Sequence, residues 1–444
     1  MPDHFDPDVA DVREAWSPTI KVCGGAGNRK SGGTDGTDSD TEIVRVFTWS
    51  GTKSSFLRTC GLFSGSRTRE YHIYNYGMNK FNDMSSTRQW MKMAEWDAAI
   101  KPFFDEPKII VFNSRHIPAS LLQAWPPRSL LLIANDESNR FGFSHPVIKA
   151  KDGNVIGPHV RKRTFYGPHD ASMKRPNGKD WTASGVNLTG HLDGLFVKNQ
   201  ESRFGICETD PEKCPGVVNL VTKLNIPLQV VPIFKQYYSR RHAQSFPGTF
   251  HWFPLGPRFE FQRPSSFPGP QIPRSYLFNF IGSPTSLARQ RLAAAWNTIA
   301  ATAQANYNIP ESRVRFHLAQ KWAADTSEGN FAPVDYAAIL QDSTFTLCPQ
   351  GNNVDQFRIY EAVESGSIPV VALEHGLANK TLAPSTMASP IVFVNRWEPE
   401  TFKQLAEMER DAFGISFRRK ALQEWYQTLL DETLTSLESA LSQK

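Results

Sequence analysis

The stretch that decides the fold is TFTLCPQGNNVDQFRIYEAVESGSIPVV, residues 344–371. It opens with an apolar run of strand length, and Gly351 in the following loop permits the positive φ angles of a tight turn. A helix is predicted from Val354 to about Ser365, and Gly366 provides its C-terminal stop before a second apolar run begins. Strand, glycine loop, helix and strand in this order predict a βαβ unit with parallel strands.

The loop of this unit, which contains Pro349 and Gly351, leads into a helix N-terminus, where unpaired N–H groups and a positive dipole favour an anion. Arg358 lies near the start of that helix and can fork onto phosphate oxygens. Glu361, one turn later, would repel a phosphate but can accept hydrogen bonds from two ribose hydroxyls. The pair therefore suits a nucleoside diphosphate. The alternative is an i,i+3 salt bridge between Arg358 and Glu361, and local spacing alone favours that alternative.

A second glycine turn has the same form. The run YLFNFI predicts a strand over residues 276–281 that ends in Gly282 and Ser283, and a helix carrying Arg289 and Arg291 follows. Backbone N–H groups in such a turn can bind a phosphate, and Arg289 would add positive charge. The alternative is a strand–helix turn with solvated arginines, and the local sequence does not choose between the two.

Short apolar runs alternate with helical patterns through both halves of the 444-residue chain, so the predicted fold class is α/β. Residues 1–41 are rich in Gly, Ser and Asp without apolar periodicity and are predicted to be a disordered tail. An N-terminal domain is predicted over 42–268, with an insertion around 142–215, and a C-terminal domain over 269–444, ending in a helix from Phe417. Two such halves predict two Rossmann-like domains that face a cleft.

The run SLLLIA predicts a buried strand of the first domain, and Asp136 and Glu137 follow it closely. Carboxylates at the carboxyl end of a parallel strand can serve as a general base. The alternative is helix capping, which is the commoner role of an aspartate in this position. His251 lies near a later strand and is interpreted as a packing or capping residue rather than a base.

The composition limits the classes of function. The net charge of +5 is mildly basic, and no DNA- or RNA-binding motif is present, so a nucleic-acid partner is not expected. No apolar run approaches the ~20 residues of a membrane span, and the first 16 residues lack the apolar core of a signal peptide. No ordered His/Cys set has zinc spacing, so no metal site is predicted.

The five cysteines leave one question open. Cys207 and Cys214 bracket a short polar loop, where a local disulfide and two free thiols are equally good interpretations.

Several segments resemble the exostosin family of glycosyltransferases, and within it a branch of xylosyltransferases. They are FTLCPQGNNVDQFRIYEAVESGSIPVV, YLFNFIGSPTSLARQ, FHWFPLG, PIVFVNRW and RRKALQEWYQ. The resemblance covers about the last 200 residues well and the first domain loosely. It implies a GT-B fold of two Rossmann-like domains, a nucleotide-sugar donor in the C-terminal domain and inversion at the anomeric carbon.

The resemblance also implies roles for the site residues. Glu361 would bind the donor ribose, and the diphosphate would lie against the other predicted donor residues: Gly282, Ser283, Arg289, Pro349, Gly351 and Arg358. Asp136 or Glu137 would be the base. From the resemblance we expect a UDP-sugar donor, with xylose as the sugar, and a glycan or glycoprotein acceptor. We also expect metal-independent chemistry without a cofactor, a Golgi location and a complex with other glycosyltransferases. The alternative function is a non-catalytic exostosin-like subunit of such a complex.

Overall fold

The computed structural model describes most of the C-terminal half and separate parts of the N-terminal half. The described residues are 19–24, 41–49, 54–76, 100–113, 127–134, 232–238, 250–262, 269, 273–284, 286–318, 331–351, 353–373 and 382–442. The insertion predicted around 142–215, both cysteines of the polar loop, and Asp136 and Glu137 lie outside them.

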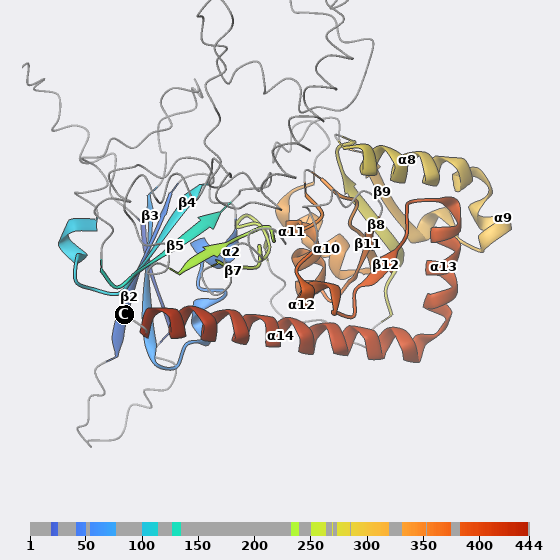
Figure 1. Cartoon of the computed structure of the whole chain (residues 1–444). Helices are drawn as coiled ribbons and strands as arrows, with labels where there is room; N and C mark the ends of the chain where they lie inside the picture. The colour runs from blue at the N-terminus through green and yellow to red at the C-terminus, as the bar shows by residue number, and fades with distance from the viewer. Residues whose placement is uncertain are drawn as a thin grey trace, which may run out of the picture.

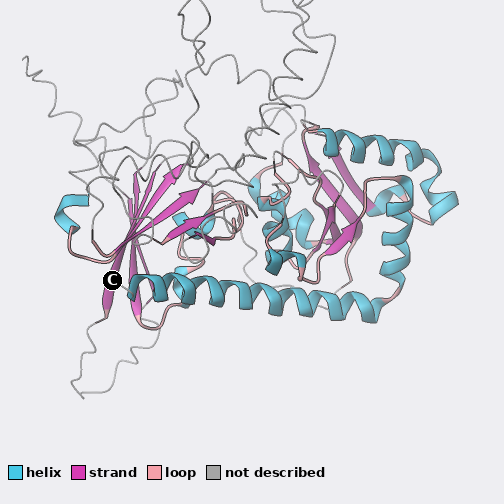
Figure 2. Ribbon diagram, in the orientation of Figure 1, coloured by secondary structure: helices cyan, strands magenta, loops and turns pink. Residues whose placement is uncertain are grey.

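A seven-stranded sheet forms the first domain, with the spatial order β1-β3-β2-β4-β5-β6-β7 (Figures 1 and 2). All neighbouring strands are parallel except β1 and β3. The strands are β1 (Thr19–Gly24), β2 (Glu42–Trp49), β3 (Arg69–Tyr76), β4 (Lys108–Asn113), β5 (Ser129–Ala134), β6 (Ile233–Lys235) and β7 (Phe250–Trp252). Strand β5 is buried along its whole length, as expected of a continuous apolar run in a parallel sheet.

Strand β1 corrects the prediction that the whole of residues 1–41 is disordered. Residues 19–24 pair with β3 in antiparallel register, and Cys23 forms a disulfide with Cys60, which follows the short helix α2 (Ser55–Arg58). Both partners lie far along the chain, so the local composition of the tail carries no sign of them.

A five-stranded parallel sheet forms the second domain, with the order β12-β11-β10-β8-β9. Its strands are β8 (Tyr276–Gly282), β9 (Val314–Leu318), β10 (Ser343–Leu347), β11 (Ile368–Ala372) and β12 (Val392–Val394). The helices of this domain are α8 (Leu287–Ile299), α9 (Ala303–Tyr307), α10 (Pro333–Gln341), α11 (Phe357–Glu364), α12 (Pro384–Met387) and α13 (Pro399–Arg410). The predicted α/β class and the two Rossmann-like domains are confirmed.

Helix α11 begins at Phe357, three residues later than predicted. The backbone N–H of Asp355 donates a hydrogen bond to Oδ1 of Asn353 at 3.2 Å, and Gln356 has an extended backbone. This local turn uses a side chain to satisfy the backbone, so the residues before Phe357 stay outside the helix.

Both sheets share one strand order. Apart from the added strand β1, the first strand of each sheet lies between the second and the third, namely β2 between β3 and β4, and β8 between β9 and β10. In such doubly wound sheets the chain switches direction between the first and third strands, and ligands bind outside the carboxyl ends of those strands. In the second domain this switch point lies beyond Gly282 of β8 and Leu347 of β10.

Helix α14 (Ala412–Ser442) links the two domains. It follows α13 at a sharp corner and runs below both sheets, so that the C-terminus lies beside the first sheet (Figure 1). It begins five residues before the predicted Phe417, and its buried face includes Leu422, Tyr426, Leu429, Leu434 and Leu437. None of the described helices combines the length and the apolar character needed to cross a membrane.

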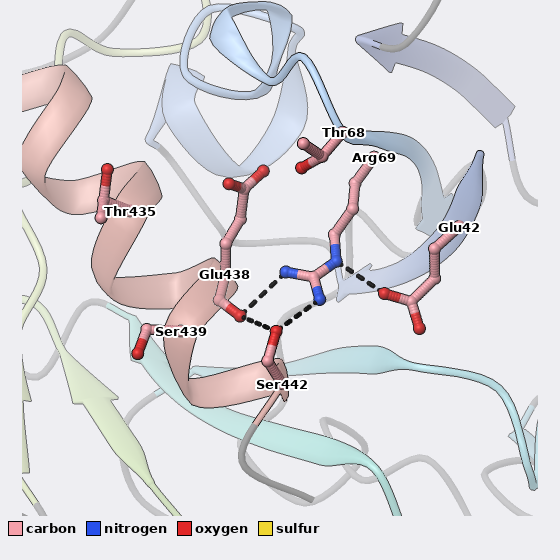
Figure 3. Close-up of a pocket in the computed structure, with 7 residues that line it drawn as sticks. All are labelled: Glu42, Thr68, Arg69, Thr435, Glu438, Ser439 and Ser442. Atoms are coloured by element: carbon pink, nitrogen blue, oxygen red, sulfur yellow. Dashed lines mark hydrogen bonds and ion pairs between the residues drawn. The ribbon is translucent and has the colours of Figure 1, made fainter. Parts of the chain in front are cut away.

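The end of α14 is held to the first domain by Arg69 of β3. Its guanidinium donates hydrogen bonds to the carbonyl of Glu438 and to Oγ of Ser442, both at 2.8 Å, and pairs with Glu42 at 2.7 Å (Figure 3). A cation at a helix C-terminus satisfies the last carbonyls and complements the helix dipole. These residues line an open pocket of about 460 Å³, which contains none of the predicted donor residues.

Candidate functional site

The two glycine loops predicted to bind the donor lie side by side at the switch point of the second sheet. Ser286 caps α8 by accepting a hydrogen bond from the backbone N–H of Arg289 at 3.3 Å, and its hydroxyl donates to the carbonyl of Gln350 at 2.5 Å. This contact joins the turn after β8 to the loop after β10. Helices α8 and α11 begin just after these loops, so the positive ends of both helix dipoles lie near the same place.

Arg358 reaches from the first turn of α11 to the end of β8. Its Nη2 donates a hydrogen bond to the carbonyl of Ile281, and its guanidinium lies 4.9 Å from the ring centre of Phe280. A Cβ atom on Gly282 would lie only 3.0 Å from Nη2, so glycine leaves room for this approach. Nη1 of Arg358 is buried without a hydrogen-bond partner, which leaves a charged donor free for a ligand.

Arg289 approaches the same region from α8. Its Nη1 donates to the carbonyl of Ser283 at 3.3 Å, and a Cβ atom on Gly351 would lie 3.4 Å from its Nη2. Oγ of Ser283 and Oε1 of Gln350 are buried near it without hydrogen-bond partners. Pro349 belongs to the buried start of the same loop as Gly351. The structure thus brings together the six residues predicted to lie against the diphosphate, namely Gly282, Ser283, Arg289, Pro349, Gly351 and Arg358.

Glu361 is almost fully buried, with 5% of its surface exposed. Its Oε2 accepts a hydrogen bond from the Tyr336 hydroxyl at 2.8 Å, and its Oε1 accepts one from the backbone N–H of Arg258 at 3.3 Å. Within the described part of the chain, Arg358 and Glu361 form no direct salt bridge, because the Arg358 side chain turns toward β8. A carboxylate has about four acceptor positions, so Glu361 keeps capacity for two ribose hydroxyls.

The pKa of the buried Glu361 carboxyl lies above its ordinary value. Burial raises the pKa of Glu361, while the Tyr336 hydrogen bond and the charge of Arg358 act in the opposite direction. Burial raises the pKa of Cys348 to about 12, so this thiol at the end of β10 stays protonated at neutral pH. Cys348 is therefore a packing residue and not a nucleophile.

Asp355 is a buried acidic residue of the loop after β10 that the sequence interpretation did not single out. It is 2% exposed, its Oδ1 accepts a hydrogen bond from the Tyr360 hydroxyl at 3.1 Å, and its Oδ2 has no partner. Burial raises its pKa to about 7, and the Tyr360 hydrogen bond and the charge of Lys235 oppose that rise. Lys235 is the last residue of β6, so the carboxyl group of Asp355 interacts electrostatically with a charge from the first sheet.

The two domains meet around α11. Phe56 of α2 lies 6.5 Å from the ring of Tyr360 and 6.4 Å from the ring of Tyr426 in α14. Gly256 has a φ of +64°, and a Cβ atom there would lie 2.7 Å from the Phe56 ring. Since glycine alone fits this position without strain, the segment that carries the Arg258 N–H can pass close to Glu361.

The first domain holds the predicted bases and His251. The predicted bases lie beyond Ala134, where β5 ends, and outside the described residues. His251 belongs to β7 and stacks on Phe234 with ring centres 4.9 Å apart, which fits the packing role predicted for it. Beside it, Tyr237 follows β6 with a φ of 58°, a backbone conformation that is uncommon for a tyrosine.

Two further contributors to the site carried no sequence signal. Tyr336 lies on α10, 25 residues before its partner, and Arg258 contributes only its backbone N–H. In the described part of the chain, no group of three or more His, Cys, Asp or Glu side chains could hold a metal ion.

Comparisons with known proteins agree with the resemblance of the C-terminal part. Residues 260–444 match the family model described as RXYLT1 C-terminal domain. Ribitol-5-phosphate xylosyltransferase 1 of Homo sapiens is 35% identical over 117 residues, which are 22% of this chain and 25% of that protein. The Danio rerio protein of the same name is 28% identical over 169 residues, 34% of this chain and 35% of its own length. The matched parts thus span a quarter to about a third of these relatives.

Solved structures give low similarity. The calicheamicin glycosyltransferase CalG4 has a TM-score of 0.32 and 12% identity, with 78% of each chain covered. The spinosyn forosaminyltransferase SpnP has a TM-score of 0.35 and 9% identity, with 79% of each chain covered.

Proposed function

We propose, for a chain whose residues 260–444 match the RXYLT1 C-terminal domain, that it is an inverting glycosyltransferase that uses a UDP-sugar. The observation that carries the proposal is the convergence of Arg289 and Arg358 on two glycine loops at the switch point of the second sheet. Two cations, two helix N-termini and an unpartnered guanidinium N–H suit a diphosphate. Xylose as the sugar and a glycan hydroxyl as the acceptor are the finer parts of the proposal.

The reaction follows from these positions. The acceptor oxygen attacks the anomeric carbon from the face opposite the diphosphate, and the bond from that carbon to the phosphate oxygen breaks. UDP leaves with the bonding electrons, and Arg358 and Arg289 stabilise the negative charge that grows on its phosphates. Glu361, oriented by Tyr336 and by the Arg258 N–H, would hold the ribose hydroxyls.

The proton of the acceptor hydroxyl needs a base on the side of the first domain. Asp136 or Glu137 remains the proposal for this role, since β5 ends at Ala134 and its carboxyl end belongs to the edge where parallel sheets bind ligands. We also propose that the transfer needs no metal, because the two guanidinium groups supply the positive charge that a divalent cation would otherwise bring to the diphosphate.

A donor screen tests this function. We expect UDP release to be fastest with UDP-xylose among UDP-xylose, UDP-glucuronate, UDP-galactose and UDP-N-acetylglucosamine, and to persist in EDTA. Glu361→Gln should weaken UDP binding about 10- to 100-fold, because it removes the charge from a carboxylate that accepts hydrogen bonds from the donor. Calorimetric titration with UDP measures this loss.

The control for that variant is Glu364→Gln, another buried carboxylate of α11, which accepts a hydrogen bond from Tyr426 at 2.7 Å instead of lining the donor site. Equal UDP affinity of the two variants would contradict the role of Glu361. UDP binding without turnover of any donor or acceptor would favour a non-catalytic subunit of a glycosyltransferase complex.

We further propose that the chain works in an oxidising compartment, such as the Golgi lumen. The support is the Cys23–Cys60 disulfide, which joins β1 to the segment after α2, with Cα atoms 5.2 Å apart. We expect mass spectrometry of unreduced peptides to find these two cysteines linked and Cys348 free. Full alkylation of Cys23 and Cys60 in the native, unreduced protein would contradict the proposed compartment.

A further inference from the structure

A cluster of arginines lies at the amino ends of the second sheet, at the opposite end of the strands from the donor loops. Arg274 precedes β8 and Arg313 precedes β9, while Arg419 belongs to α14. A carboxylate partner of the cluster is Glu409, near the end of α13. The cluster therefore lies at the corner between α13 and α14, where the chain leaves the sheet for the first domain.

Glu409 is fully engaged by part of this cluster. Nη1 and Nη2 of Arg313 donate to its two oxygens at 2.9 and 2.8 Å, a bidentate pair. The Thr344 hydroxyl donates to the same carboxylate at 2.8 Å. Both oxygens of Glu409 are thus already engaged by Arg313, and one of them also by Thr344.

Arg274 has no comparable partner. It is 8% exposed, and both its Nε and its Nη2 are buried without a hydrogen-bond acceptor. Its contact with the cluster is through its backbone carbonyl, which accepts from Nη2 of Arg313 at 3.2 Å. Burial lowers the pKa of Arg274, with the charge of Asp342 opposing this effect. A buried guanidinium with unmade hydrogen bonds is costly, so it indicates a missing acceptor.

Arg419 adds a second buried charge. It is 5% exposed and reaches the Thr344 hydroxyl oxygen at 3.5 Å, the outer limit of a hydrogen bond. Burial and the charge of Arg274 lower its pKa to about 10, while Glu409 acts in the opposite direction. The two arginines therefore repel each other, while the charges of Asp342 and Glu409 act on Arg274 and Arg419 in the opposite direction.

We propose that Arg274 and Arg419 bind a small inorganic oxyanion, with phosphate as the representative ligand, at a site distinct from the donor site. Such an anion would accept hydrogen bonds from the two buried N–H groups of Arg274 and would remove the repulsion between the arginines. The ligand is small because both side chains are more than nine-tenths buried, which leaves little room for the body of a phosphate ester.

The place of the site gives the anion a role. Glu409 is the last residue but one of α13, just before the corner, and Arg419 lies two turns into α14. An anion between Arg274 and Arg419 therefore ties α14 to the base of β8. Since α14 also supports the first domain, anion binding would stabilise the joint between the two domains.

Thermal unfolding in phosphate tests the proposal, in the full chain carrying Arg358→Ala so that phosphate binding at the donor loops does not contribute. We expect a saturable rise in Tm of about 2–4 °C with added phosphate, compared with sodium gluconate at equal ionic strength. Arg274→Gln in the same background should abolish the rise. Arg396→Gln should keep it, because Arg396 is 67% exposed and pairs with Glu398 at the surface.

Glu409→Gln should increase the phosphate-dependent rise in Tm, whereas Arg274→Gln should abolish it. This second variant also provides a test if Arg274→Gln fails to fold. Without this carboxylate the cluster has more uncompensated charge, so Tm without phosphate should fall and the phosphate-dependent rise should grow. A purely structural role of these residues predicts no such gain. The proposal is overturned if phosphate gives no saturable rise in the Arg358→Ala chain, or if the rise survives Arg274→Gln or fails to grow in Glu409→Gln.

Discussion

Replacing Arg358 with alanine is expected to lower kcat for sugar transfer by about 10²- to 10³-fold, while the protein stays folded. Arg358 provides the buried, unpartnered Nη1 at the switch point, and its other terminal nitrogen is fixed on the carbonyl of Ile281. A group held in place before the reaction stabilises the charge that develops on the leaving diphosphate without reorganisation. The loss should therefore appear mainly in kcat, measured by UDP release with saturating donor.

Two comparisons make this result specific. Arg396→Ala removes an exposed arginine from the same domain and should leave kcat within a factor of two, since surface ion pairs contribute little. Lys in place of Arg358 should recover part of the rate, because it restores the charge without the planar fork. If Arg358→Ala changes neither kcat nor KM, the diphosphate does not bind at these loops.

Replacing Asp355 with asparagine is expected to flatten the dependence of stability on pH. Burial raises the pKa of Asp355 to about 7 in the folded chain, against roughly 4 for an unfolded aspartate. A carboxyl group with a raised pKa favours the folded state below pH 4, and this contribution is lost as the pH rises from about 4 to about 7. This pKa difference corresponds to a decrease in the free energy of unfolding on the order of 4 kcal/mol between pH 4 and pH 7.

The measurement is urea unfolding of both proteins between pH 4.5 and 8. Asp355 is largely protonated below its raised pKa, so the charge that interacts with Lys235 is present only toward pH 8, and the slope of stability between pH 4.5 and 7 is the decisive quantity. Asp431→Asn changes an exposed carboxylate and serves as the control for the slope. Parallel profiles of wild type and Asp355→Asn would mean that Asp355 titrates normally.

The sequence predicted those parts of the fold that depend on local pattern. The unit at 344–371 folds as strand, loop, helix and strand, because its apolar runs and its glycines act over a few residues. The two loops predicted to bind the donor do lie side by side, because strand-end loops of a parallel sheet converge at one edge. What local spacing could not decide was the partner of Arg358, which is a carbonyl 77 residues away.

The rest of the site depends on contacts between distant segments. Tyr336 reaches Glu361 from α10, and the Arg258 N–H reaches it from the segment after β7. The sequence around Glu361 gives no sign of either contact. Asp355 was within the quoted stretch, yet its significance comes from burial and from Lys235 in the other domain. Strand β1 likewise owes its order to β3 and to Cys60.

Helix α14 has a consequence for the order in which the chain acquires its structure. Ser66 and Glu438 are joined by a hydrogen bond across 372 positions, and Arg69 reaches the carbonyl of the same glutamate across 369. Contacts of such long range close large loops and form late. During synthesis the N-terminal domain leaves the ribosome first, yet the residues that complete its support emerge 369 to 372 positions later. The amino-terminal sheet is therefore completed only after α14 has been synthesised, and the two domains finish folding together.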